Sequence, residues 1–233
     1  MRVLVALLCI VTRVWTVNAN VEKTIFLGPS PVTLAHVQPS LDDLHLQVLS
    51  PSDTILPTQL PVQFPSASVP RGPASWYLLR GLEDGRRYEV RICWPATQPT
   101  DFLVDTYPVT QVFNTPELIH SLARYSEQLQ DPRLQFKQYT QETGPAAAQS
   151  VLFLRIQAAA SYYSTNRTLM SSPLPVHVDI ILDPFILNVF PRSLAPVAVY
   201  ISAVVIGAWF LSAYVYDWLL HVAAEVPSKP HTD

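Results

Sequence analysis

The side chains that could carry out chemistry in this sequence are scattered along it. The adjacent carboxylates Asp42–Asp43 and Glu83–Asp84 could act as acids or metal ligands, but they are better explained as solvated turn residues. The histidines show no paired ligand spacing and no neighbouring cysteine; they are His36, His45, His120, His177, His221 and His231. Neither a nucleophile elbow nor a phosphate-binding glycine loop occurs. We therefore expect no catalytic residue, no metal and no cofactor.

One motif does predict a modification. Asn166-Arg167-Thr168 is an N-glycosylation sequon, and it lies in the polar stretch 161–172 between two predicted strands. A loop on the lumenal side of a membrane is where such a sequon is modified. We predict that Asn166 carries a glycan.

The N-terminal residues support this lumenal placement. A basic start at Arg2, an apolar run over 3–11 and the small-residue site ending at Ala19 are typical of a signal peptide at 1–19. The apolar run is too short to span a bilayer, which needs about 20 residues. The domain after it, at 20–183, is therefore expected in the lumen.

A second apolar segment predicts a membrane span. No charged residue occurs over 193–216, which is long enough to cross the hydrocarbon core. We place a transmembrane helix at 194–218, a juxtamembrane segment at 184–193 and a largely polar cytosolic tail at 219–233. Because the signal peptide delivers the N-terminal domain to the lumen, the protein is expected to be single-pass type I. The polar tail argues against a GPI attachment signal, which ends in its apolar stretch.

Small residues in the predicted span could form a contact with another helix. Ala203 and Gly207, like Ala208 and Ser212, are four residues apart, a spacing that allows close helix approach in lipid. These four residues are the predicted partner-helix contact. The apolar juxtamembrane segment is expected to lie in the membrane interface or against a neighbour.

Composition limits the lumenal domain. Of the two cysteines, Cys9 is lost with the signal peptide, so no internal disulfide forms and core burial must stabilise the fold. Cys93 lies in an apolar strand and is interpreted as a core thiol. The net charge of −3 gives no basis for nucleic-acid binding.

The pattern of the lumenal domain predicts a mainly β fold, an immunoglobulin- or fibronectin-like β-sandwich with one short helix. The chain has 22 prolines, which mark turns and strand edges; the segment 57–73 is interpreted as a connection. Strands are expected at 21–27, 44–49, 88–94, 151–158 and 176–182, and a helix is expected from Thr115 to a stop at Asp131–Pro132. The spacing of Leu82, Gly85 and Tyr88 resembles a corner at which a tyrosine ties back to the preceding turn.

The sequence also resembles a known family. The stretches that carry the resemblance are 21–27, Tyr88–Pro95 with 98–102, and Asp183-Pro184-Phe185. They are similar to the accessory, non-catalytic subunit of fungal GPI mannosyltransferase II. The resemblance implies an endoplasmic reticulum membrane protein whose partners are the polytopic catalytic subunit and membrane lipid. It supplies no catalytic residue.

Other functions fit the same layout. The accessory subunit of GPI mannosyltransferase I is similar in organisation. A subunit of a membrane-protein insertion or folding complex would also combine a single span with a lumenal β domain. A cell-surface adhesion or receptor protein fits less well, because the domain has no disulfide and the tail is short.

Overall fold

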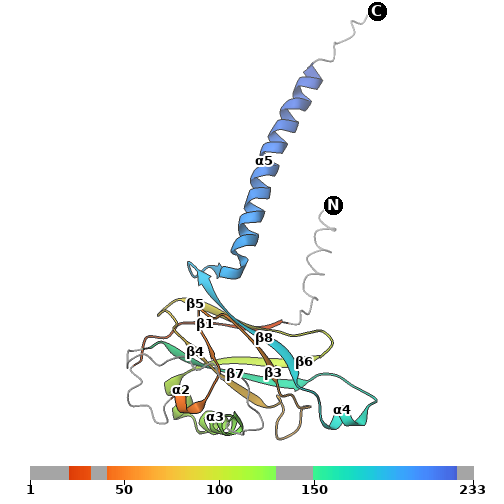
Figure 1. The fold of residues 1–233 in the computed structure, drawn as a ribbon. Helices are drawn as coiled ribbons and strands as arrows, with labels where there is room; N and C mark the ends of the chain where they lie inside the picture. The colour runs from red at the N-terminus through yellow and green to blue at the C-terminus, as the bar shows by residue number, and fades with distance from the viewer. Residues whose placement is uncertain (1–20, 33–40, 130–148, 225–233) are drawn as a thin grey trace, which may run out of the picture. The chain divides into compact units, whose positions relative to one another are not determined.

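The computed structural model of the chain describes residues 21–32, 41–129 and 149–224 (Figure 1). The predicted signal peptide at 1–19 and most of the predicted tail lie outside the described residues. The chain divides into two compact units, Met1–Val189 and Phe190–Asp233. The first unit contains two β-sheets, and the second contains the apolar helix.

The first sheet is fully antiparallel along its main path. In spatial order its strands are β1 (Val21–Leu27), β5 (Arg87–Cys93), β8 (Val176–Ile186) and β3 (Ile55–Leu60). The strands predicted at 21–27 and 88–94 therefore exist and are hydrogen-bonded neighbours. Strand β8 pairs with β5 on one side and with β3 on the other.

The second sheet has four strands. Its order is β2 (Val48–Leu49), β4 (Ala74–Arg80), β7 (Val151–Ala160) and β6 (Thr100–Pro108). Only the short β2 runs parallel to its neighbour β4. The other pairs are antiparallel, and β6 pairs with β7 over its whole length.

Apolar side chains from the inner faces of both sheets form one core. On β5, Tyr88, Val90 and Ile92 are fully buried, as the alternating pattern predicts. The opposing residues include Tyr77, Leu79, Leu152, Leu154 and Ile156. Each such side chain contributes about 1.5–3 kcal/mol through burial. The two sheets therefore share one core and are held together by burial, without a disulfide among the described residues.

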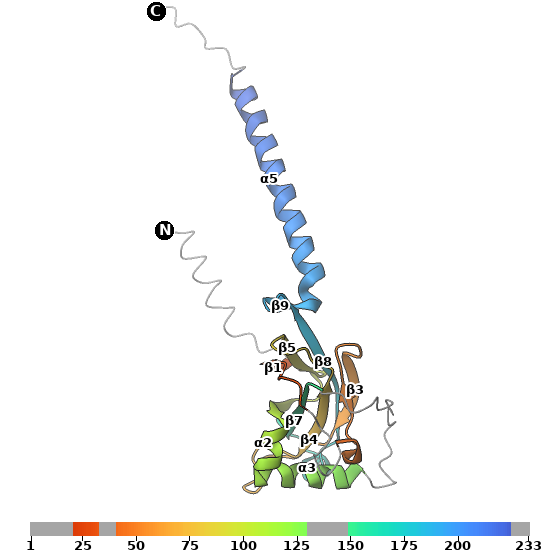
Figure 2. The same ribbon diagram turned by 90° about the vertical axis from the view of Figure 1, so that its left-hand side faces the viewer.

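Two helices cover the outer face of the second sheet. Helix α2 (Val109–Asn114) follows β6 directly, and α3 (Pro116–Leu129) lies alongside it against β4 (Figure 2). A second core fills the space between helices and sheet, with Trp76 and Phe153 fully buried at its centre. Strands β4 and β7 are thus buried on both faces, which explains why apolar residues occupy successive positions in them, as in Trp76–Leu79 and Val151–Leu154.

The prediction of one short helix was incomplete. The helix that begins after Thr115 is confirmed as α3, but α2 and α4 (Arg167–Ser171) are additional helices in this unit. Helix α2 was missed because Pro108 precedes it without a side-chain cap and because its valines are typical of strands. The domain is therefore a sheet-rich mixed fold.

The predicted strand at 44–49 was also largely wrong. Residues Leu41–Leu44 form a 3₁₀ helix, and the backbone at His45 has a φ of 54°. Because that left-handed conformation interrupts an extended chain, the strand starts only at Val48.

The sequence prediction was wrong at two strands because proline was interpreted as a strand breaker. Strand β3 includes Pro57, inside the segment interpreted as a connection, and it is tolerated because β3 lies at the edge of its sheet. Strand β8 continues through Pro184, although the sequence pattern stops it there. The amide of Leu182 points towards Thr54, so the nitrogen of Pro184 faces the same side, beyond the end of β3. The missing N–H of Pro184 therefore costs no hydrogen bond to β3.

The predicted tyrosine tie-back is confirmed. The hydroxyl of Tyr88 accepts a hydrogen bond from the backbone N–H of Glu83 at 3.0 Å, and the side chain is fully buried. Cys93, by contrast, is not a core residue. It is half-buried on the face of β5 opposite to Tyr88, because it shares the parity of Glu89 and Arg91. The immunoglobulin-like topology itself stays a prediction.

Buried tyrosines predict a loss of stability at alkaline pH. Burial raises the pKa of Tyr77 well above its ordinary value of 10.0, and burial likewise raises the pKa of Tyr125. The folded pKa exceeds the unfolded one, so the stability that the neutral tyrosines contribute is complete below about pH 10 and is lost as the pH rises through the folded pKa.

Thermal unfolding of the full chain in detergent, from pH 8 to pH 11.5, should show Tm falling above pH 10. Tyr77→Phe should flatten that fall. The control is Tyr163→Phe, at a residue 85% exposed; equal slopes for the two variants would contradict the prediction.

Candidate functional site

The second unit consists mainly of one long apolar helix. Helix α5 (Ala195–Ala224) follows a 3₁₀ turn at Arg192–Leu194, and none of its side chains is buried. The segment 192–224 has a mean hydropathy of 2.1, which makes it long and apolar enough to cross a membrane. The helix is apolar on all sides, as expected of a segment in contact with lipid. The predicted span at 194–218 begins within one residue of α5 and lies otherwise inside it.

The four predicted contact residues do not share one face of α5. A helix turns about 100° per residue, so Ala203 and Ala208 lie about 140° apart around the axis. Ala203 and Gly207 therefore form one small-residue pair, and Ala208 and Ser212 form another on a different face. A single partner helix can pack closely against only one of them.

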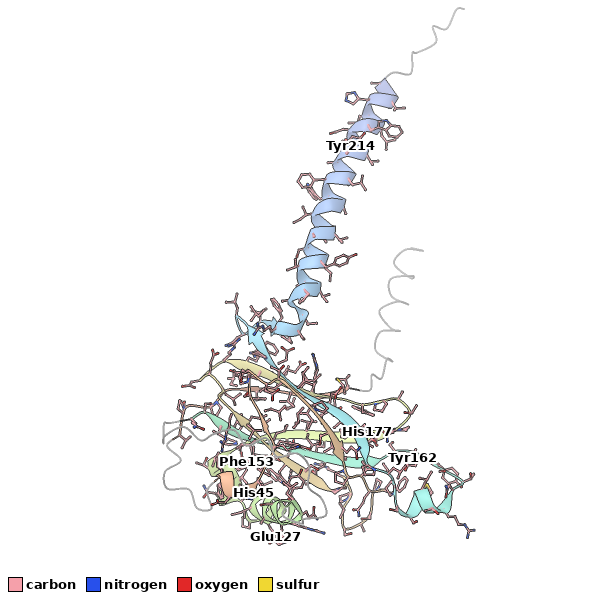
Figure 3. All side chains as sticks on the ribbon, viewed as in Figure 1. His45, Glu127, Phe153, Tyr162, His177 and Tyr214 are labelled. Atoms are coloured by element: carbon pink, nitrogen blue, oxygen red, sulfur yellow. The ribbon has the colours of Figure 1, made fainter. Side chains whose placement is uncertain are left out.

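The Ala203–Gly207 pair is better suited to close packing, and we call the depression that it forms on the helix surface the Ala203–Gly207 notch. A Cβ added at Gly207 would meet no atom within 4 Å, so the backbone there is open to an approaching helix. Tyr200 and Tyr214 lie on the same face, one before and one after the pair, and Figure 3 shows Tyr214 projecting from the helix. Two large side chains therefore border a depression that a second helix could enter.

The other face is less suited to close packing. Ala208 and Ser212 each carry a side chain, so this pair lacks the open backbone found at Gly207. Trp209, which is 76% exposed, lies about 60° from Ser212 around the axis. Ser202, on the same side, donates its hydroxyl to the carbonyl of Ala198 at 2.8 Å. Its hydrogen bond is thus made within the helix and needs no partner.

A charged cluster that the sequence did not reveal lies on the outer face of the first sheet. Glu89 and Asp183 are directly opposite each other on β5 and β8, and both are buried. Arg91 lies 3.7 Å from Glu89 and 3.6 Å from Asp183, while Lys23 contacts Glu89 at 3.0 Å. Like charges facing each other across a ladder repel, so the two cations are needed to hold this arrangement.

Exposed aliphatic side chains surround that cluster. Ile25 and Leu27 on β1 and Ile55 on β3 are each more than half exposed, and they share the face of Glu89 and Arg91. In the sequence, Glu89 and Arg91 alternate with the apolar Tyr88, Val90 and Ile92, a pattern that indicates an outward-facing position for both charged residues. Asp183 was missed because Asp183–Pro184 was interpreted as the end of the strand. The face combines a neutral charge network with apolar surface, as protein interfaces do.

The sequon lies at the start of α4. Asn166 is the N-cap of this helix, and its side-chain oxygen accepts a hydrogen bond from the N–H of Thr168 at 3.0 Å. Both residues are exposed, so an enzyme acting on the sequon would have access. The predicted loop is therefore a short capped helix, and glycosylation of Asn166 stays a prediction.

Separating the glycan from the cap gives a direct test of Asn166. Asn166→Asp keeps a capping side chain and destroys the sequon, and Thr168→Ala destroys the sequon while keeping the Asn cap. Both variants should migrate faster in gel electrophoresis, by the mass of one glycan. Loss of an N-cap interaction costs about 1 kcal/mol of stability, so any fall in Tm should be no larger than that cost produces. Endoglycosidase treatment should remove the difference from the parent protein. Unchanged migration of both variants would exclude modification at this site.

No metal-binding constellation occurs among the residues that the structure describes. His45 and His177, labelled in Figure 3, lie in separate parts of the first unit. The imidazole of His177 contacts the side-chain nitrogen of Gln59, at 3.3 Å from Nε2. Elsewhere in the described part, Arg155 pairs with Asp105 at 2.7 Å and Arg86 pairs with Glu83.

The fold and the helix together define a class: a sheet-rich protein with one candidate membrane-spanning helix. Within that class the chain belongs to the Pga1 family, described as the GPI-mannosyltransferase II co-activator, whose family profile matches residues 74–215. The resemblance seen in the sequence is thereby confirmed. The matched region runs from β4 into α5, so the family includes the helix as well as most of the sheets.

A relative in fission yeast agrees with this assignment. The chain is 20% identical over 143 residues to a GPI mannosyltransferase 2 subunit of Schizosaccharomyces pombe. The alignment covers 61% of this chain and 56% of the relative, so it spans little more than half of that protein. No solved structure matches the chain.

Proposed function

We propose that this protein is a non-catalytic subunit of GPI mannosyltransferase II, which stabilises or positions the polytopic catalytic subunit that adds the second mannose. Membership of the co-activator family is the observation that carries the proposal. The chemistry of the described residues agrees with it: the buried carboxylates Glu89 and Asp183 are paired with Lys23 and Arg91 on a sheet face.

The proposed topology is single-pass type I in the endoplasmic reticulum membrane. Helix α5 spans the bilayer, with its ends at the lipid headgroups and its sides in contact with lipid or with the catalytic subunit. The sheet domain then lies in the lumen, where Asn166 is available for glycosylation. The absence of a disulfide among the described residues leaves the domain dependent on its two hydrophobic cores.

The proposed partner contact is the notch at Ala203 and Gly207. Helix association in lipid depends on close backbone approach, because lipid tails and apolar side chains differ little in hydrophobicity. An open glycine bordered by tyrosines supplies such an approach. The catalytic subunit has many spans, so it offers helices of the length that α5 requires.

Analysis of GPI precursors after depletion of the protein tests this function. If the second mannose is added inefficiently, the intermediate carrying a single mannose accumulates. Affinity purification of the full chain in mild detergent should recover the mannosyltransferase. Normal precursors together with no recovered mannosyltransferase would overturn the proposal.

The same lipid analysis separates the alternatives. A subunit of GPI mannosyltransferase I would cause accumulation of the precursor without mannose. A subunit of an insertion or folding complex would lower the amounts of several unrelated polytopic proteins, with no specific precursor accumulating. Surface labelling of intact cells tests the adhesion or receptor alternative.

A further inference from the structure

A strained turn at the end of β8 exposes two apolar side chains. The turn Ile186–Val189 is closed by a hydrogen bond from the N–H of Val189 to the carbonyl of Ile186 at 3.0 Å. Its central residues, Leu187 and Asn188, have φ values of 51° and 57°. Turns with both central residues in this region are normally made by asparagine and glycine, because other side chains are disfavoured there. A leucine is therefore an unusual choice at the first position.

Packing within the fold does not offset the conformational cost of Leu187. Leu187 is 89% exposed and Val189 is 71% exposed, so neither contributes to a core of the protein. A conformationally costly residue that makes no internal packing indicates a contact outside the chain.

The turn is held rigidly in place by the neighbouring Asn188. Its side-chain oxygen accepts a hydrogen bond from the N–H of Arg87 at 2.8 Å, and its side-chain nitrogen donates to the carbonyl of Gly85 at 3.0 Å. Arg86 also donates from Nε to the carbonyl of Phe185 at 3.3 Å. The turn is thus tied to the corner before β5, and the exposed side chains are presented on a fixed support.

Chain length restricts how far this turn can be from the apolar helix. Val189 precedes the first residue of α5, Ala195, by six positions. A chain extends at most about 3.6 Å per residue, which keeps the two residues within roughly 22 Å of each other. The headgroup layer of a bilayer is itself several ångströms thick on each side of the core. If α5 spans the membrane, the turn is therefore within reach of the lipid surface.

The charges around the turn favour an apolar mode of contact. Arg86 pairs with Glu83, and Asp84 accepts a hydrogen bond from the hydroxyl of Ser30 at 3.2 Å. Arg87 lies 5.8 Å from the ring of Phe185. Two arginines and two acidic residues leave no net charge at this corner, so attraction to anionic lipid is not needed.

We propose that the turn Ile186–Val189 is a membrane-interface anchor, with Leu187 and Val189 inserted among the lipid headgroups. This inference rests on the proposed function only in requiring that α5 spans the bilayer. The anchor gives the sheet domain a second point of attachment, which restrains its tilt relative to the membrane. A domain fixed at two points can present a constant face to a membrane-embedded partner.

Site-directed nitroxide labelling of the full chain tests the anchor. Cys9 and Cys93 are replaced by serine, and single cysteines are introduced in separate variants as Leu187→Cys, Leu174→Cys and Val204→Cys. Each labelled protein is reconstituted in nanodiscs of phosphatidylcholine without any partner protein. Collision of the label with oxygen, which is enriched in lipid, is compared with collision with a water-soluble nickel chelate.

Leu174 is the matched control, because it is 64% exposed and precedes β8, whose other end carries Leu187. We expect the ratio of oxygen to nickel collisions to be several-fold higher at 187 than at 174. Val189→Cys provides a second anchor position if labelling at 187 lowers Tm. Equal ratios at 187, 189 and 174 would overturn the anchor, and would do so even if the turn contacts a partner protein in cells.

The label at Val204 distinguishes the two proposals. Lipid exposure at 204 with water exposure at 187 and 189 overturns the anchor alone. Water exposure at 204 overturns the span on which the proposed topology depends.

Discussion

Replacing Gly207 by leucine should reduce recovery of the mannosyltransferase with this protein by about ten-fold or more. A ten-fold loss corresponds to about 1.4 kcal/mol, which is within the range of contacts between membrane helices. The leucine side chain fills the open space at Gly207 and prevents close approach at the Ala203–Gly207 notch. The single-mannose precursor should accumulate in the same cells.

The fold of the variant should be unaffected. A Cβ at Gly207 meets no atom of the chain within 4 Å, and leucine is a better helix former than glycine. A lost association therefore cannot be attributed to a damaged helix. Gly207→Ala is the intermediate case, with a smaller loss because a methyl group only partly fills the notch.

Ala208→Leu is the matched control on the other face. It adds a side chain of the same type one residue away, about 100° around the helix. Recovery should stay near the level of the parent protein. The notch would be excluded as the contact if Gly207→Leu bound normally, and the contact would be assigned to the other face if only Ala208→Leu failed.

The parts of the fold that sequence predicted best are those in which local pattern and burial agree. Tyr88, Val90 and Ile92 alternate with charged residues, and all three are fully buried in the structure. The same parity places Cys93 on the outer face. Local alternation was a better guide to its position than the general tendency of cysteine to be buried.

Other parts depend on where a strand lies in its sheet, which local sequence does not specify. Pro57 is tolerated in β3 because that strand is at an edge, and Pro184 takes no hydrogen bond from β3 because the β3 pairing ends before reaching it. Proline rules predict a loop at both positions. These predictions were wrong because local sequence does not show which neighbouring strand each proline faces.

The candidate surfaces were predictable to different degrees. The apolar helix was evident from sequence, because membrane-spanning length and the absence of charge are local properties. The Glu89–Asp183 pair was not, since it joins strands whose register only the fold sets. The turn at Leu187 was hidden for a related reason: its central residues, Leu187 and Asn188, lack the glycine expected in such a turn.

Replacing Gly72 by alanine should destabilise the sheet domain more than any other alanine substitution at a glycine of its described part. A Cβ at Gly72 would lie 1.8 Å from the carbonyl oxygen of Ala158, a backbone atom of β7. The backbone at Gly72 also has a φ of 75°, where alanine is strained. Since Ala158 is buried in a strand paired on both sides, the clash cannot be relieved by rotating a side chain.

The variant Gly85→Ala distinguishes the two sources of destabilisation in Gly72→Ala, which are backbone strain and steric clash. The φ of Gly85 is 70°, but a Cβ there meets nothing within 4 Å, so Gly85→Ala introduces strain without a clash. Strain alone costs about 1–2 kcal/mol. Gly72→Ala should cost at least about 2 kcal/mol more, in the range that only severe packing damage reaches.

Thermal unfolding of the full chain in detergent measures the difference. At about 2–4 °C per kcal/mol for a domain of this size, Gly85→Ala should lower Tm by a few degrees and Gly72→Ala by roughly twice as much or more. The same prediction is met if Gly72→Ala is too unstable to accumulate as folded protein while Gly85→Ala accumulates normally. Equal Tm values for the two variants would mean that the loop at Gly72 can move away from β7, and that the close approach there is not needed to hold the second sheet together.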